Sequence, residues 1–471
     1  MPSNASTSIA ASLADWLVST PPGDIPAEVM QDATWRLVDQ IGVGLAGVAD
    51  ESAQIVARLT RQRGGTPEAT VIGFGGKYPA AAAGWTNGAI GHVTDYDDMH
   101  GVAAVHISSV AVPAALAAAE AAGASGLDTL AALSLGAEVA LRIATGAPPH
   151  QFHHRGLHGT GVAGPFAAAA IAAKISGLGA EQATNALGMA GSRSSGLMQT
   201  LIDGSWVKRL HPGWAVEGGL TCAALAADGY TGPREVVEGT FGFFHALLHG
   251  DEQTFQFDQI LDGLGSRWLL PDTTYKPWPN GVWNHASMDG AAAIVSREGL
   301  AVADIERIDC HVPPICIPIV CEPRAAKLNL NSPYHAKFSL QYSVAMLLIN
   351  GYVSVDDYTD ALLANPAYAE LAGRVFCHAD EAMAPDFFPA RVELTTKDGR
   401  RYVEDVPAQR GTSRNPMTPA DHRAKFMANA SPRLGTERAD RLRMELEHFR
   451  ELDSIAHVLE LTVPEAATVS R

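Results

Sequence analysis

Several common signatures of secreted and membrane proteins are missing from this 471-residue sequence. It has five cysteines, an odd number with no Cys-x-x-Cys pair, which indicates a reduced protein without a disulfide or structural zinc framework. No apolar run reaches the roughly 18 residues of a membrane span without a Gly, Pro or polar interruption. The first residues are polar, with no basic flank and no apolar run behind them, so we expect no signal peptide. These absences predict a cytoplasmic protein.

Positive charge is also scarce, because 34 Lys and Arg residues stand against 51 Asp and Glu, a net charge of −17. This balance disfavours nucleic acid and anionic membranes as partners. The sequence contains no phosphate loop, dinucleotide fingerprint, Gly-x-Ser-x-Gly elbow or His-Glu-x-x-His motif. Nucleotide, flavin and serine-hydrolase chemistry are therefore disfavoured.

What the chain does have is helical periodicity and abundant alanine. Residues 8–50 carry apolar side chains at helical spacing, from Val29 to Leu45. The many Ala and Gly residues imply close packing between helices. We therefore expect a mainly α protein, with residues 1–270 as the first part of an all-helical main domain. Its other predicted helices lie at about 109–124, 127–146, 162–176, 181–198 and 213–229.

The pattern changes after Leu270, where strand signals enter and Asp398-Gly399 predicts a type I′ hairpin. We expect residues 271–407 to form a smaller α+β domain. Because the pattern is helical again from 419 to 448, residues 408–471 are predicted to return to the helical domain, which makes the smaller domain an insertion. The elements predicted within it are strands at 305–312, 391–395 and 402–406 and helices at 288–299 and 335–350.

The densest polar chemistry runs from Asp95 to His106, Asp-Tyr-Asp-Asp-Met-His-Gly-Val-Ala-Ala-Val-His. Three carboxylates and two imidazoles stand here between two strongly apolar segments. Charge in such a place is costly unless it is paired or used. A solvated loop that caps the next helix, with Ser108 or Ser109 as the N-cap, explains this stretch equally well when it is taken alone.

Four further places carry polar groups beside glycines or helix starts. Each is a weak signal, since a lone loop histidine or a basic turn is usually just surface. Together, cations near helix N-termini could bind carboxylates, and imidazoles could transfer protons near neutral pH. The four places are Gly156-Leu-His158-Gly-Thr-Gly161, Trp206-Val-Lys208-Arg209-Leu-His211, the run from Tyr275 and Lys276 to His285, and Tyr334-His335-Ala-Lys337.

With these places in view, the chain resembles the MmgE/PrpD family of 2-methylcitrate dehydratases, cis-aconitate decarboxylases and iminodisuccinate epimerases. The resemblance implies a helical main domain, an α+β lid domain, a homodimer, and a site between the domains that needs no metal or organic cofactor. Other stretches that carry the resemblance are Asn87-Gly-Ala-Ile-Gly-His92, Ser195-Gly-Leu-Met198, Ala336-Lys-Phe-Ser-Leu340 and Gly411-Thr-Ser-Arg-Asn-Pro-Met-Thr418.

Position by position, the resemblance also implies which residues form the site. The catalytic set that it implies is Asp95, His106, His158, Lys208 and His285. The candidate substrate-binding residues are Met99, Arg209, Lys276, Trp278 and Trp283.

The sequence departs from the family pattern at several points, and these bear on the substrate. Met99 stands where the family usually has Thr or Ser, Ile107 replaces a proline, and Arg193 stands where Gln or Ala is common. Trp278 and Trp283 are bulkier than the residues often found in the lid loop and could narrow the cleft or line it for an apolar group.

We therefore expect a cofactor-independent lyase that acts on a small di- or tricarboxylate. Lys208, Arg209 and Lys276 would neutralise carboxylates and acidify the adjacent C–H bond, and an imidazole would move the proton. Dehydration, decarboxylation and epimerisation pass through similar carbanion-like species, so the sequence leaves the reaction, the substrate and the acid and base histidines open. We rank 2-methylcitrate dehydratase-like activity first, then cis-aconitate decarboxylation, then epimerisation of an amino- or imino-dicarboxylate.

Two alternatives belong to other classes. One is a magnesium-dependent helical enzyme that would use Asp95, Asp97, Asp98 and His100, although no second aspartate-rich cluster follows. The other is a non-catalytic relative, which would be expected to have lost the His and Lys set that is intact here.

Overall fold

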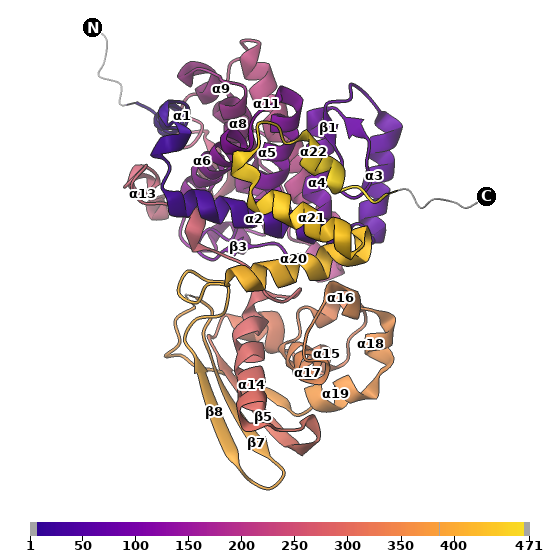
Figure 1. Cartoon of the computed structure of the whole chain (residues 1–471). Helices are drawn as coiled ribbons and strands as arrows, with labels where there is room; N and C mark the ends of the chain where they lie inside the picture. Colours follow the sequence, from indigo (N-terminus) through magenta and orange to yellow (C-terminus); the bar gives the residue numbers. More distant parts are fainter. Residues whose placement is uncertain (1–6, 386, 466–471) are drawn as a thin grey trace, which may run out of the picture. The chain divides into compact units, whose positions relative to one another are not determined.

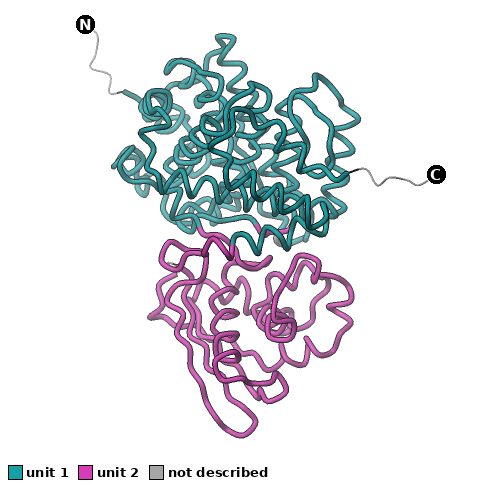
Figure 2. Tube along the Cα trace, in the orientation of Figure 1, with its two compact units in different colours: residues 1–93, 97–273, 422–471 teal, residues 94–96, 274–421 magenta. Residues whose placement is uncertain are grey.

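The computed structural model of the chain describes residues 7–385 and 387–465, and it is mainly α-helical (Figure 1). Contacts divide the chain into two compact units (Figure 2). Unit 1 comprises residues 1–93, 97–273 and 422–471, and unit 2 comprises residues 94–96 and 274–421. The domain limits at 271 and 407 stay predictions, since compact units do not by themselves show independent folding. None of the helices in the described ranges is both long and apolar enough to cross a membrane.

Unit 1 is a body of helices around one large hydrophobic core. Its longer helices are α1 (Ile9–Ser19), α2 (Ala27–Gly47), α3 (Glu51–Arg63), α4 (Ala80–Ile90), α5 (Ser108–Ala122), α6 (Gly126–Thr145), α8 (Gly159–Ile175), α9 (Ala180–Gly191) and α11 (His211–Ala227). Shorter elements are α7 (Gln151–His154), α10 (Thr200–Asp203), α12 (Phe243–Leu247), α13 (Phe257–Leu261) and the strands β1 (Ala69–Thr70), β2 (Lys77–Tyr78) and β3 (Met99–His100).

Small residues let α8 and α11 pack closely. A Cβ atom on Gly219 would lie 2.5 Å from the Cβ of Ala168, and one on Gly164 would lie 2.8 Å from the Cβ of Ala215. Larger side chains at these places would force the helices apart, because cores pack at crystal-like density. The close packing holds the N-termini of α8 and α11 in fixed positions relative to each other, and both N-termini belong to the site described below.

The C-terminal helices α20 (Pro419–Leu434), α21 (Thr436–Glu447) and α22 (Ala456–Leu461) add to this core. Phe426, Leu442 and Phe449 are fully or almost fully buried in it. Lys425 also forms a buried ion pair with Asp39 of α2, with 2.7 Å between Nζ and Oδ1. Both apolar packing and an ion pair thus hold the C-terminal helices to the rest of unit 1.

Unit 2 holds a four-stranded sheet in the order β6-β5-β7-β8, in which only β5 and β6 run parallel. Alternating burial along β7 places Val392 and Leu394 in the core of the unit. A Cβ atom on Gly290 of α14 would lie 2.9 Å from Val392 Cγ2, so this helix lies directly on the sheet. The elements are α14 (His285–Glu298), β5 (Ile305–Val312), α15 (Arg324–Leu328), α16 (Pro333–Ala336), α17 (Leu340–Asn350), α18 (Asp360–Ala364), α19 (Pro366–Ala372), β6 (Val375–Ala379), β7 (Ala390–Thr396), β8 (Arg401–Val406) and the two-residue strand β4 (Thr273–Thr274), which begins in unit 1.

The hairpin at Asp398-Gly399 is confirmed, but its predicted turn type is wrong. A type I′ turn needs positive φ at both central residues, and here Gly399 has φ 86° while Asp398 does not appear among the residues of positive φ. Gly399 N donates to Thr396 O, and Thr396 N donates to Arg400 O. These bonds describe a three-residue loop that ends in a left-handed glycine. The Thr396 hydroxyl bonds the Asp398 carboxylate, which favours this turn.

Most predicted helices of unit 1 are confirmed within a few residues, but two predictions need correction. The helix expected at 181–198 ends at Gly191, and Ser194 beyond it donates its hydroxyl to Val162 O of α8. The helix expected at 335–350 is divided, because Ser339 starts a new helix as the N-cap of α17. Serine favours this position, since its hydroxyl accepts a bond from an otherwise unpaired helix N–H.

Candidate active site

Three helices of unit 1 begin at one place. His106 precedes α5 by two residues, His158 is the N-cap of α8, and His211 is the first residue of α11. Lys208 lies in the short turn before α11, and His92 follows the end of α4. Helix N-termini carry partial positive charge and unpaired N–H groups, so their convergence favours a bound anion.

The histidine cluster is our name for four buried residues, each in ring contact with at least one other: His92, His106, His158 and His211. The His92 ring centroid lies 4.7 Å from that of His106 and 5.5 Å from that of His158. His106 and His158 are 5.9 Å apart, and His158 and His211 are 5.1 Å apart. Residues up to 119 positions apart in the sequence thus form one cluster of polar side chains in unit 1.

A chain of hydrogen bonds joins Asp97 to Lys208 through His92. The Nδ1 of His92 lies 2.7 Å from Asp97 Oδ2, and its Nε2 lies 2.9 Å from Lys208 Nζ. An ionised carboxylate accepts hydrogen bonds but cannot donate one. His92 therefore donates to Asp97 from Nδ1 and accepts the lysine's N–H at Nε2. The same carboxylate oxygen lies 3.4 Å from Nδ1 of His106. Asp97 therefore orients one imidazole and lies beside a second.

The two ring nitrogens of His158 have different surroundings. Its Nδ1 lies 3.0 Å from Nδ1 of His211, so one of these two nitrogens carries the shared proton. Its Nε2 is buried and has no hydrogen-bond partner in the structure. A buried polar atom without a partner is uncommon and suggests a place for a ligand.

The surroundings keep several of these imidazoles neutral. Burial lowers the pKa of His92 to about 3 and that of His211 to about 4, and Lys208 adds to both shifts. Burial, followed by Lys208 and the other imidazoles, holds the pKa of His158 well below its usual range. Burial alone would raise the pKa of Asp97, but charge and hydrogen bonds from His92 and His106 outweigh it and hold that pKa low. The free site thus combines a carboxylate with neutral imidazoles.

The glycines around His158 serve close packing of the backbone. A Cβ atom on Gly159 would lie 2.5 Å from Ala104 O, and one on Gly161 would lie 2.3 Å from Ser195 O. Side chains at these positions would collide with neighbouring carbonyl groups. By allowing this close approach of the backbone, Gly159 and Gly161 position the imidazole of His158, which is itself buried.

The acidic run does not act as one group of metal ligands. Asp98 pairs with Arg36 of α2, with 2.6 Å between Oδ2 and Nη1, and its other oxygen accepts from Ser108 N at the start of α5. Asp97 faces His92, and Asp95 belongs to unit 2. Because the carboxylates have separate partners, the geometry gives no support to the magnesium-dependent alternative.

In unit 2, the predicted Asp95 and Lys276 come together. Lys276 Nζ donates to Asp95 O at 2.7 Å and lies 3.2 Å from Asp95 Oδ2. His285 is the first residue of α14 and is buried. Trp278 belongs to the core of unit 2 and donates its indole N–H to Asp289, while Trp283 packs against that core. Roles for these residues in catalysis or substrate binding stay predictions.

Two other candidates have separate places in unit 1. The guanidinium of Arg209 is bound at the start of α3. It lies 2.9 Å from the carboxylate of Asp50, the N-cap of that helix, and also donates to the hydroxyl of Ser52. Met99 is buried in β3. We therefore do not assign the carboxylate-binding role to Arg209.

The catalytic set predicted from the sequence did not include His92, Asp97 or His211, although His211 was among the polar groups noted beside helix starts and Asp97 belonged to the magnesium alternative. His92 stands five residues before Asp97, directly after an apolar helix, and that isolated polarity was the available signal. Its partner Lys208 is 116 positions away, so no local pattern could reveal the pairing.

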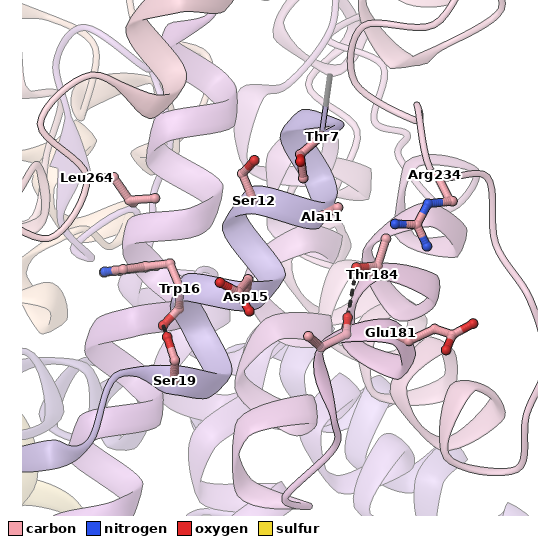
Figure 3. Close-up of a pocket in the computed structure, with 11 residues that line it drawn as sticks. Thr7, Ala11, Ser12, Asp15, Trp16, Ser19, Glu181, Thr184, Arg234 and Leu264 are labelled. Carbon is pink, nitrogen blue, oxygen red and sulfur yellow. Dashed lines mark hydrogen bonds between the residues drawn. The ribbon is translucent and has the colours of Figure 1, made fainter. Parts of the chain in front are cut away.

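A separate hollow lies between α1 and α9 of unit 1 (Figure 3). Its lining includes Asp15, Trp16, Glu181 and Arg234, and it contains none of the predicted site residues. The hydrogen bonds drawn in Figure 3 run from the hydroxyl groups of Ser19 and Thr184 to backbone carbonyl groups, and none joins two side chains as the bond of Asp97 and His92 does. We therefore do not take this hollow as the active site.

Two family models match the chain, and together they cover most of it. The MmgE/PrpD N-terminal domain matches residues 11–256, and the MmgE/PrpD C-terminal domain matches residues 278–450. The chain belongs to the MmgE/PrpD family. It is a lyase of the MmgE/PrpD type. The histidine cluster lies within the part that matches the N-terminal model, and His285 within the part that matches the C-terminal model.

The most similar relatives include cis-aconitate decarboxylases over nearly the whole chain. A cis-aconitate decarboxylase-like protein of Aspergillus oryzae is 28% identical over 96% of this chain and 97% of its own length. The human cis-aconitate decarboxylase is 27% identical over 95% of this chain and 94% of its own length. A 2-methylcitrate dehydratase of Salmonella typhimurium is 25% identical, but over only 51% of this chain and 50% of its own.

Proposed function

We propose that this MmgE/PrpD lyase decarboxylates a small tricarboxylate of the cis-aconitate kind. The observation that carries the proposal is the meeting of Lys208 and the histidine cluster at three helix N-termini. That place offers positive potential for carboxylates and imidazoles for proton transfer, within one buried site.

Lys208 is the group that we assign to a substrate carboxylate. Its ammonium donates an N–H bond to Nε2 of His92, which directs the positive charge of the lysine toward the histidine cluster. The N-termini of α5, α8 and α11 add further positive potential. In a site from which water is excluded, such fixed charges stabilise the negative charge that develops as the C–C bond breaks.

His158 is the group that we assign to proton transfer. Loss of CO₂ leaves an electron pair on the substrate, and a proton must then reach carbon. The imidazole is neutral in the free site, and a bound anion would raise its pKa because negative charge stabilises the imidazolium. It could then deliver a proton from Nε2, the buried atom without a partner. His106 is a second candidate for this step.

Decarboxylation ranks above dehydration because of the coverage of the relatives. The Aspergillus oryzae protein and the human decarboxylase match nearly the whole chain, whereas the 2-methylcitrate dehydratase of Salmonella typhimurium matches about half of it. This reverses the order expected from the sequence. Dehydration of a 2-methylcitrate-like substrate is the second candidate, since it needs the same carboxylate binding and proton transfer.

The deciding experiment offers purified protein a panel of substrates and follows them by proton NMR. The panel is cis-aconitate, 2-methylcitrate, citrate and a 2-amino-dicarboxylate, with His158→Ala as the matched control. We expect loss of the cis-aconitate vinyl signal with appearance of a decarboxylated product. Faster conversion of 2-methylcitrate would support dehydration instead, and equal rates in wild type and control would contradict the site.

Two finer proposals rest on the family resemblance. One is that residues 271–407 act as a lid whose position depends on a bound carboxylate, which small-angle scattering with and without an inhibitor would test. The other is a role for Asp95, Lys276 and His285 in the same reaction. Alanine variants of these residues with unchanged turnover would contradict it.

A further inference from the structure

The histidine cluster has a second property that decarboxylation does not use. Among the described residues, His92, His106 and His158 form a group in which one ring nitrogen of each lies within 4.8 Å of the others. All three side chains are buried. Three converging imidazoles with one open position are a common ligand set for Zn²⁺ and related ions.

Asp97 holds His92 in the way that a carboxylate holds a metal-binding histidine. Such histidines usually hold their second nitrogen on a carboxylate, carbonyl or water. Here Nδ1 of His92 bonds Asp97, Nδ1 of His106 lies 3.4 Å from the same carboxylate, and Nδ1 of His158 bonds His211. The Nε2 atoms of His92 and His158 are therefore the ones directed to a ligand, and that of His158 has no partner.

One group competes for this place, the ammonium of Lys208. It lies 2.9 Å from His92 Nε2 and uses the lone pair that a metal would need. A divalent ion and an ammonium group would also repel each other strongly at this distance. The two cations therefore exclude each other, and the structure shows the state in which the lysine is present.

We propose that His92, His106 and His158 bind a divalent transition-metal ion such as Zn²⁺, which displaces Lys208 and so inhibits the enzyme. Zn–N bonds of about 2.0–2.1 Å imply about 3.4 Å between ligand nitrogens, so rings now within 4.8 Å close by about 1.4 Å at most. Imidazole ligands select Zn²⁺, Cu²⁺, Ni²⁺ or Co²⁺ over Mg²⁺ and Ca²⁺. The ion is an inhibitor in this proposal, because the displaced lysine is the group assigned to the substrate carboxylate.

The cysteines of unit 2 are weaker competitors for the ion. Cys310 pairs in register with Cys377 across β5 and β6, and Cys316 and Cys321 lie near them. Burial raises the pKa of the Cys316 thiol to about 12, with Cys377 adding to the shift. Metal binding requires the thiolate, so the protonated thiol of Cys316 binds poorly near neutral pH.

The test is a titration of the full-length protein, freed of metal with a chelator, and needs no substrate. Zn²⁺ binding is measured by calorimetry, and Co²⁺ binding by the visible absorption of a tetrahedral site. We expect one ion per chain, with affinity about tenfold or more lower in His158→Ala. The sharpest expectation is that Lys208→Met binds Zn²⁺ about tenfold or more tightly than wild type, because the competing cation is gone.

The matched control is His153→Ala combined with His154→Ala, two exposed histidines near the site. This control should bind Zn²⁺ like wild type. If it loses the ion while His158→Ala keeps it, or if Lys208→Met binds no more tightly than wild type, the proposal is overturned. Should His158→Ala fail to fold, Asp97→Asn replaces it, with an expected loss of about 10–100-fold in affinity. Because no turnover enters the titration, failure here leaves the proposed reaction untouched.

Inhibition is then measured separately on any substrate that the NMR panel identifies. Zn²⁺ should raise KM for the carboxylate, and a chelator should restore activity. Activation by Zn²⁺ would overturn the inhibitory role.

Discussion

Lys208 Nζ lies 2.9 Å from Nε2 of His92, although 116 positions separate the two residues. The other nitrogen of that imidazole is held by Asp97 at 2.7 Å. His92 is therefore a fixed acceptor, and it decides where the lysine's charge is held. We regard it as a positioning residue that acts through Lys208.

Asp97→Asn tests this chain of bonds. The amide can donate to His92 Nδ1, which would move the ring proton to Nε2 and turn the acceptor for Lys208 into a donor. A wrong tautomer of this kind costs up to about 10⁴-fold in the serine-protease triad, and we expect about 10²–10⁴-fold in kcat/KM here. Steady-state kinetics measures the loss, and far-UV circular dichroism checks the fold. A variant within threefold of wild type would contradict the relay.

His158→Ala and Lys208→Ala should each remove nearly all turnover, for different reasons. Loss of a proton-transfer group costs about 10²–10⁴-fold in kcat. Loss of Lys208 removes a carboxylate contact and stabilisation of developing charge, so KM should rise as kcat falls. Lys208→Arg keeps the charge but not the shape and should recover only part of the activity. Unchanged kinetics in the two alanine variants would refute both roles.

His100 should make stability depend on pH. Burial lowers its pKa from 6.5 to about 4, and Arg36 adds to the shift, so the unfolded chain binds its proton first as pH falls. The free energy of unfolding should therefore fall progressively from about pH 6.5 down to pH 4, by about 3 kcal/mol in all. Urea unfolding at several pH values should show this slope reduced in His100→Gln. An equal slope in both proteins would assign the loss to other groups.

Asp98→Asn should destabilise the fold, in contrast to the catalytic effect expected at Asp97. Removing one partner of the buried Asp98–Arg36 pair typically costs about 3–5 kcal/mol, and Ser108 at the start of α5 also loses a charged acceptor. Asp32→Asn is the matched control, since Asp32 also binds Arg36 but is partly exposed and should cost clearly less. Chemical denaturation compares the two, and equal losses would contradict the structural role of Asp98.

We also predict a homodimer, chiefly from the family resemblance. Light scattering at micromolar concentration should give twice the chain mass of 49.6 kDa. A monomeric mass would refute this expectation.

The sequence by itself determined many of the elements and nominated part of the candidate site. Helical periodicity placed α5, α6, α8 and α11 within a few residues, and glycine chemistry placed the β7–β8 hairpin, because these signals lie within one turn or one pair of strands. It could also name His106, His158 and Lys208, since each stands beside a glycine or a helix start.

Only the tertiary structure decided how these groups are paired. It brought His92 and Asp97 to Lys208, and it gave Arg209 to Asp50 instead of the cluster. It also set the turn type at Gly399, where the local Asp-Gly signal permits more than one loop. The reason is physical: a pairing across 116 residues depends on how closely α4, α8 and α11 pack, and that closeness is a property of the assembled core, which no local window of sequence contains.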